Sequence, residues 1–281
     1  MSKVAIVTDS TGYIPKELIK QYNIVVIPLY VIWDGEELKD DIDITPTEFY
    51  NRLQNSSTMP STSQPTPADF QEVFARLHKD GYDILSILIS SDLSGTVSSA
   101  EQAKKALPDA TIEIFDSRST SMELGFHTLA AARAAAEGKS LSECVSAAEK
   151  ARANSGIIFA VDTLEFLHRG GRIGGANRYL GTILNIKPLL VVEDGKIEPL
   201  EKVRTKKKAQ KRVADIVTER LQGKSNIRLA ALNANAEAEA QSLIKMTAAR
   251  LDVVENIIAE VSPVIGTHVG PGTVGLAYTH D

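Results

Sequence analysis

The chain has 281 residues, of which 43% are hydrophobic and 24% are charged, and its formal net charge is −5. This composition is ordinary for a globular protein that buries a sizeable core. The negative charge argues against a nucleic-acid partner, because phosphate binding needs clustered Lys and Arg.

Two further features of the sequence indicate the cellular compartment of the protein. The single cysteine, Cys144, excludes an internal disulfide and fits a reducing environment. The first apolar run is too short for a secretory signal, and no stretch approaches the roughly 20 apolar residues of a membrane-spanning helix. We therefore expect a cytoplasmic protein without stable membrane insertion.

The first half of the chain alternates between strand-like and helix-like segments. Residues 4–8, VAIVT, form a short continuous apolar run that predicts a buried strand. Pro15 suits the first turn of a following helix. Residues 24–33 are strand-like, but Pro28 interrupts them, which predicts an edge strand or a bulge before the turn at Asp34-Gly35.

Capping motifs mark three helix starts, TPTE at 45–48, TPAD at 66–69 and SLSE at 140–143. Each has a hydroxyl residue at the cap and an acidic residue three positions later. Further strands are predicted for 84–89 and 111–115. Strands that alternate with helices imply parallel pairing through right-handed crossovers.

Later in the chain the pattern changes to hairpins and long helices. Residues 188–200, PLLVVEDGKIEPL, predict a hairpin around an Asp-Gly turn, and a strand is expected at 227–232 between two long helices. The sequence therefore predicts an α/β protein of two domains. We expect a parallel-sheet α/β domain over residues 1–155 and an α+β domain over residues 156–281.

Hydroxyl-rich loops follow the predicted parallel strands, where ligands of such sheets bind. They are DSTG at 9–12, SSDLSGT at 90–96 and DSRSTS at 116–121, and a similar loop spans 57–67. These loops are poor in Lys and Arg and contain no P-loop pattern, which argues against a polyphosphate ligand. Hydroxyls and backbone N–H groups at a helix start can instead hold a singly charged anion such as a carboxylate.

Ser94 has three candidate roles, as a helix cap, as an anion ligand or as a nucleophile. Caps are the common role of serine at a helix start. The local string DLSGT lacks the glycine two residues before the serine that a hydrolase elbow requires. A nucleophile also needs a base. Only His268 has a suitable setting, in a glycine- and proline-rich segment that predicts an ordered turn rather than a helix, so a hydrolase or phosphotransferase using Ser94 and His268 stays an alternative.

Two basic segments are conspicuous. RGGRIGG at 169–175 is typical either of an anion-binding loop or of a tight turn with exposed arginines. VRTKKKAQKR at 203–212 is typical of a solvated helix face, and it could dock an acidic partner. The chain has no Cys or His cluster, so we expect neither a metal nor another cofactor.

Taken in order, seven segments resemble the landmarks of the DegV family. They are VTDSTGYIP, TSQPTP, SSDLSGTVSSA, DSRSTSMELG, FLHRGGRIGG, IKPLL and GTHVGPGTVGLAY, and together they span residues 4 to 278. The resemblance implies two domains with a long-chain fatty acid held between them. It also implies a non-catalytic, acyl-carrying protein that presents the fatty acid to a separate ATP-binding kinase subunit, which forms an acyl phosphate. Such a role in phospholipid metabolism is compatible with transient membrane contact.

The resemblance also implies roles for particular residues. Thr62, Ser94 and His268 are expected to hold the fatty-acid carboxylate. Arg172 and Arg204 are expected to contact the kinase subunit. Glu123 stands where the family pattern has glycine, which bears on the shape of the acyl tunnel if this residue lies near the pocket.

Overall fold

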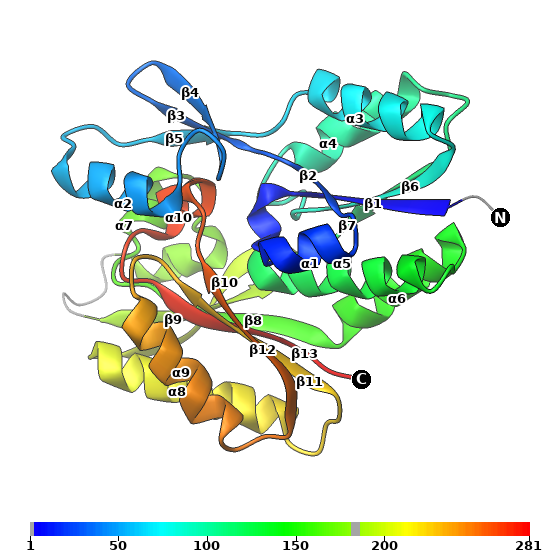
Figure 1. Ribbon diagram of the computed structural model, residues 1–281. Coiled ribbons are helices and arrows are strands. Elements are labelled where there is room, and N and C mark those ends of the chain that lie inside the picture. Colours follow the sequence, from blue (N-terminus) through cyan, green and yellow to red (C-terminus); the bar gives the residue numbers. More distant parts are fainter. Residues whose placement is uncertain (1–2, 181–185) are drawn as a thin grey trace.

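The computed structural model describes residues 3–180 and 186–281, which form five layers (Figure 1). Two helices cover a four-stranded sheet, two further helices separate this sheet from a six-stranded one, and two last helices cover the far face of the second sheet. The predicted fold class, an N-terminal parallel-sheet α/β part and a C-terminal α+β part, is confirmed.

The first sheet is parallel throughout and has the strand order β2-β1-β6-β7. Pro28 ends the edge strand β2, as predicted for a residue that cannot donate to a ladder. Helices α3 and α4 pack on one face, and α1 lies near the other (Figure 1). The elements are β1 (Lys3–Asp9), η1 (Ser10–Gly12), α1 (Lys16–Gln21), β2 (Val25–Ile27), α3 (Pro67–Lys79), β6 (Tyr82–Leu88), α4 (Thr96–Lys105) and β7 (Ile112–Asp116).

A small antiparallel sheet of order β4-β3-β5 lies beside this domain with helix α2. The turn at Asp34-Gly35 joins its first two strands as expected, but β5 lies within the hydroxyl-rich loop and was not predicted. Three residues without apolar alternation carry no strand signal, and β5 forms because β3 pairs with it. The bounds are β3 (Tyr30–Trp33), β4 (Glu36–Lys39), α2 (Pro46–Asn55) and β5 (Ser61–Ser63).

Helices α5 (Ser121–Ala136) and α6 (Leu141–Ala153) form the middle layer between the two sheets. Residues 121–129 of α5 are all buried, because this part of the helix packs between the two sheets. Capping boxes begin α2, α3 and α6 at Thr45, Thr66 and Ser140, as the sequence predicts.

The second sheet has the order β10-β9-β8-β13-β11-β12 and is antiparallel except for the β11–β12 pair. The predicted hairpin is β9–β10, with its turn at Asp194-Gly195. Helices α8 and α9 cover the outer face. The elements are β8 (Ser155–Ala160), β9 (Lys187–Glu193), β10 (Lys196–Val203), α8 (Lys206–Leu221), β11 (Ile227–Asn233), α9 (Glu237–Ala248), β12 (Val253–Glu260) and β13 (Val274–Thr279).

Three short helices complete the second half, α7 (Glu165–Arg169), η2 (Gly174–Tyr179) and α10 (Pro263–Val269), and α10 packs against α7 and against α2 and β5 of the first half. The prediction of a turn around His268 was wrong, because this residue lies in the last turn of α10. Pro263 occupies the first helical position, and the carboxylate of Asp40 accepts a hydrogen bond from Val264 N at 3.1 Å. This partner is 224 residues away, so local sequence does not reveal it.

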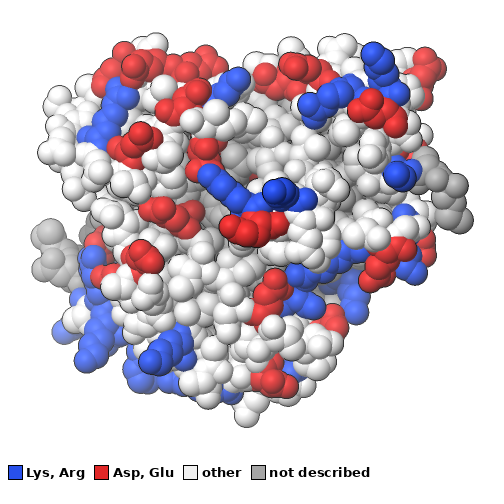
Figure 2. Space-filling view, in the orientation of Figure 1, with Lys and Arg blue, Asp and Glu red and all other residues white. Residues whose placement is uncertain are grey.

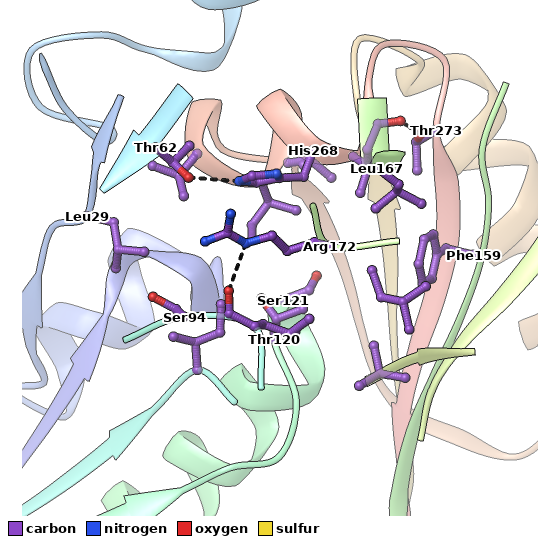
Figure 3. Close-up of a pocket in the computed structure, with 18 of the residues that line it drawn as sticks. Leu29, Thr62, Ser94, Thr120, Ser121, Phe159, Leu167, Arg172, His268 and Thr273 are labelled. Carbon is purple, nitrogen blue, oxygen red and sulfur yellow. Dashed lines mark hydrogen bonds between the residues drawn. The ribbon is translucent and has the colours of Figure 1, made fainter. Parts of the chain in front are cut away.

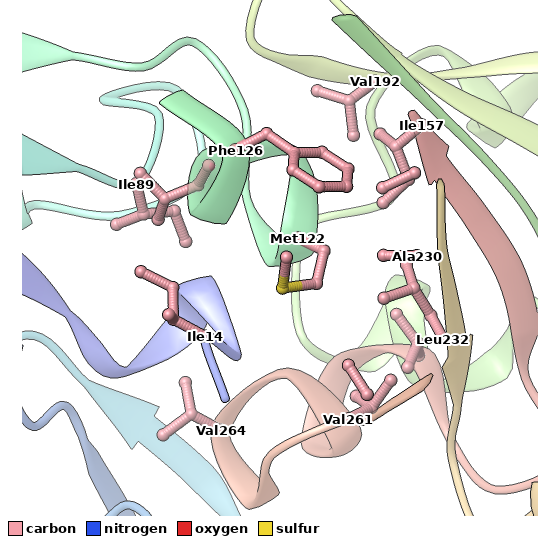
Figure 4. Close-up of a cluster of buried hydrophobic side chains, with 14 of the residues drawn as sticks. Ile14, Ile89, Met122, Phe126, Ile157, Val192, Ala230, Leu232, Val261 and Val264 are labelled. Carbon is pink, nitrogen blue, oxygen red and sulfur yellow. The ribbon is translucent and has the colours of Figure 1, made fainter. Parts of the chain in front are cut away.

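The largest apolar cluster joins the two halves (Figure 4). Met122 and Phe126 of α5 lie in Figure 4 between Ile89 of the first domain and Ile157 and Leu232 of the second sheet. The halves therefore share this cluster, and each half also contains a smaller apolar cluster of its own. No helix among residues 3–180 and 186–281 is long and apolar enough to cross a membrane.

Candidate functional site

A largely apolar cavity, part of it open to solvent, lies where the two halves meet (Figure 3). The first half contributes Leu29, Thr62, Ser63, Gln64, Ile89, Leu93, Ser94, Thr120 and Ser121, and the second contributes Ile157, Phe159, Leu167, Arg172, Val192, Ile197, Leu232, Val261, Val264, Ile265, His268, Val269 and Thr273. Thr62 on a strand, Ser94 in a loop and His268 on a helix thus reach one cavity.

Thr62 and His268 form a hydrogen-bonded pair across the domain boundary. Thr62 Oγ1 on β5 and His268 Nε2 on α10 are 2.8 Å apart. The other ring nitrogen, Nδ1, has no hydrogen-bond partner among residues 3–180 and 186–281 and faces Gly170, where a Cβ would collide with it. Because a buried N–H without a partner is rarer than an unpaired acceptor, we assign the proton to Nε2. His268 then donates to Thr62, and the Thr62 hydroxyl hydrogen is free for a ligand.

His268 is neutral at pH 7. Burial, followed by the nearby charge of Arg172, lowers the pKa of His268 to about 4. The positive charge in the cavity wall belongs to Arg172.

Ser94 does not cap α4. The N-cap position is Gly95, and no side chain in the described part of the chain caps this helix. Ser94 Oγ instead lies 2.8 Å from Thr96 Oγ1. The cap interpretation is therefore wrong, and the Ser94 side chain lines the cavity. Buried Asp9 holds the same loop in place, because its Oδ2 accepts from Ile89 N at 2.7 Å.

The described residues do not form the catalytic dyad that a nucleophilic Ser94 would need with His268. No hydrogen bond in the described part of the chain joins Ser94 to His268, whose Nε2 is paired with Thr62 and whose Nδ1 faces Gly170. A serine nucleophile needs its base within hydrogen-bond reach.

The two arginines lie in different places. Arg172 lines the cavity, and its guanidinium donates from Nε to Leu93 O at 3.1 Å and from Nη1 to Gly170 O at 2.8 Å. In Figure 3 its side chain lies between His268 on one side and Ser94 and Thr120 on the other. Arg204 is exposed in the bend between β10 and α8 and does not line the cavity.

The glycines of RGGRIGG allow backbone conformations and a close contact that other residues would not. Gly171 and Gly174 have φ values of 69° and 51°, which favour glycine. At Gly170 a side chain would collide with the ring of His268. The sequence did not single out this close approach, because it depends on an element nearly a hundred residues later.

Glu123 does not line the cavity. Its buried carboxyl accepts hydrogen bonds from Ser119 and Ser155, and burial raises the pKa of Glu123 to about 7. Ser155 Oγ also lies 2.7 Å from His127 Nε2. Glu123 thus belongs to a buried polar chain between α5 and β8, behind the cavity wall. The described residues include no group of three His, Cys, Asp or Glu that could hold a metal ion.

A family model described as "Uncharacterised protein, DegV family" matches residues 3–281. The chain belongs to the DegV family. A DegV domain-containing protein of Clostridium perfringens is 39% identical over 99% of both chains, and Protein DegV of Bacillus subtilis is 35% identical over 98% of both.

Solved structures of DegV relatives have the same fold. A Thermus thermophilus DegV family protein described for its fatty-acid binding has a TM-score of 0.94 at 36% identity and covers 99% of this chain and 100% of its own. Bacillus subtilis DegV, described as a fatty acid binding protein, has a TM-score of 0.91 at 34% identity with full coverage of both chains. A stearic acid-binding protein from Eubacterium ventriosum has a TM-score of 0.91 at 26% identity, covering 100% of this chain and 98% of its own.

Proposed function

We propose that this protein binds a long-chain fatty acid in the cavity between its halves and holds the carboxylate with Thr62 and Ser94. The observation that carries the proposal is an apolar cavity with a few convergent hydroxyls, in a fold whose solved relatives are described as fatty-acid-binding proteins. His268 acts on the ligand through Thr62, because its Nε2 is already engaged.

The energetics suit such a ligand. Burial of roughly 14 methylenes at about 0.8 kcal/mol each contributes about 11 kcal/mol. The cost of association, about 4–15 kcal/mol, offsets much of this gain. Two hydrogen bonds to the carboxylate, each worth about 1.5–3 kcal/mol, then decide orientation and net affinity. Arg172 supplies the complementary charge that the neutral His268 lacks.

Native mass spectrometry of the protein purified from bacterial cells tests this proposal. We expect a bound mass equal to one fatty acid, lost on organic extraction and restored by added stearic acid. A lipid-free protein that neither takes up stearic acid nor changes its mass would contradict fatty-acid binding. Ester hydrolysis by the extracted protein would favour the hydrolase alternative.

We further infer that the protein presents the bound acid to an ATP-binding kinase subunit that phosphorylates the carboxylate, and so is itself not catalytic. The exposed Arg204 and the basic start of α8 support a docking role for this region, because Lys206, Lys207 and Lys208 are exposed as well. Figure 2 shows Lys and Arg gathered at the lower left, where Figure 1 places α8. Arg172 faces the cavity and is better suited to the carboxylate than to a partner.

Charge reversal at Arg204 separates the two roles. Arg204→Glu should leave fatty-acid occupancy unchanged, because Arg204 does not line the cavity, and should lower acyl-phosphate formation about tenfold with a fatty-acid kinase subunit and ATP. Lys105→Glu on α4, an exposed residue of the other domain, is the matched control. Equal rates for wild type and Arg204→Glu would place the docking surface elsewhere.

A further inference from the structure

The N-terminus of α5 opens into the acyl cavity without a cap. Thr120 occupies the N-cap position, but its side chain makes no capping hydrogen bond. The first N–H groups of a helix need an acceptor, and they carry the positive end of the helix dipole. At 16 residues, α5 is long enough for this dipole to be substantial.

Two hydroxyls at the same place also lack partners. Thr120 Oγ1 and Ser121 Oγ are buried and have no hydrogen-bond partner among the described residues. Thr120 is 8% exposed and Ser121 is 3% exposed, and both line the cavity. Buried hydroxyls are nearly always paired, so two adjacent exceptions in one pocket indicate a missing partner.

The backbone supports the same conclusion. Ser121 has a φ of 59°, in the left-handed region that serine rarely adopts. Such strain persists where the surrounding structure fixes it, and it is frequent at ligand sites. In Figure 3 Ser121 lies on the opposite side of Arg172 from His268, toward the apolar wall that includes Phe159.

A plain alkyl chain that passes this point would leave both hydroxyls unpaired, at a cost in affinity. An oxygen atom on the chain would accept their hydrogen bonds and benefit from the helix N-terminus. We propose that Thr120, Ser121 and the N-terminus of α5 form a second polar subsite, which selects long-chain acids that carry a hydroxyl or oxo group along the chain. This inference rests on the proposed fatty-acid binding and names its preferred ligand class.

Competition against a fluorescent fatty acid, with protein extracted free of lipid, tests the inference. The competitors are stearic acid and octadecanoic acids with one hydroxyl near the carboxyl end, at mid-chain or near the methyl end. We expect one hydroxylated isomer to bind wild type about tenfold tighter than stearic acid. In the double variant Thr120→Val, Ser121→Ala this preference should vanish, so that the hydroxylated isomer and stearic acid bind with similar affinities.

Thr128→Val on the same helix is the matched control, because the Thr128 hydroxyl is partnered and does not line the cavity. It should keep the preference. Stearic-acid binding by each variant also reports that the variant is folded.

If no isomer binds wild type more tightly than stearic acid does, or if the double variant keeps the preference, the subsite is refuted while fatty-acid binding stands. If stearic acid itself fails to bind wild type, both proposals are overturned.

Discussion

Thr62→Val should weaken fatty-acid binding about ten- to hundredfold. Valine keeps the shape of threonine but removes the hydroxyl that we assign as a donor to the carboxylate. A hydrogen bond to a charged group is worth about 1.5–3 kcal/mol, which corresponds to this range of affinity. The loss also leaves His268 Nε2 without its partner at 2.8 Å. Displacement of a fluorescent fatty acid measures the change.

Ser61→Ala is the control for this variant, because Ser61 lies on the same strand but is exposed and does not line the cavity. It should bind as wild type does. If His268 acts only through Thr62, a His268→Gln change should cost little in the Thr62→Val background, which a double-mutant cycle detects. Unchanged affinity in Thr62→Val would remove Thr62 from the carboxylate site.

Local chemistry made much of the fold predictable. The capping boxes at Thr45, Thr66 and Ser140 act within one helical turn, and the Asp194-Gly195 turn needs only its own backbone conformation. The parallel sheet follows from the alternation of short apolar runs with helices. These features are set by residues close in sequence, so they could be deduced before any contact was known.

Helix α10 escaped prediction because distant residues stabilise it. Its seven residues include Gly266, which discourages a helix in isolation, yet a side chain there would collide with Tyr50 of α2. The carboxylate of Asp40 replaces a local cap. For Ser94, the sequence could not tell which of Ser94 and Gly95 occupies the N-cap position of α4.

The candidate site was predictable as a set of residues through the family resemblance, but its chemistry was not. The neutrality of His268 depends on burial and on Arg172, and the direction of Arg172 depends on the carbonyls of Leu93 and Gly170. Thr120 and Ser121 stood within a hydroxyl-rich loop, and only their missing partners distinguish them from ordinary loop residues.

The position of His268 depends on how α10 is held against the first domain. Asp40, which is 1% exposed, accepts hydrogen bonds from Ser262 Oγ at 2.8 Å, from Ser10 Oγ at 2.7 Å and from Val264 N at 3.1 Å. One carboxyl thus joins the end of β1 to the start of α10. Asp40 therefore contributes both to the position of α10 in the site and to the contact between the two halves.

Asp40→Ala should lower the free energy of unfolding by roughly 3–5 kcal/mol, because three buried donors lose their acceptor. Asp40→Asn keeps one acceptor oxygen and should lower the free energy of unfolding by less than half as much.

Burial raises the pKa of Asp40 to about 7, so the folded protein holds the proton of the Asp40 carboxyl group more tightly than the unfolded chain does. The stability of wild type relative to Asp40→Asn should therefore fall as pH rises from about 4 to about 7 and stay level above it.

Urea unfolding of both proteins at several pH values measures this difference. The raised pKa of Glu123 is common to wild type and Asp40→Asn, so its contribution to the pH dependence of unfolding cancels when the two proteins are compared. Because Asp40 positions α10, Asp40→Ala should also weaken fatty-acid binding under conditions in which it remains folded. A stability difference that rises with pH over this window would mean that Asp40 is buried as a stabilised carboxylate, with its three donors outweighing desolvation.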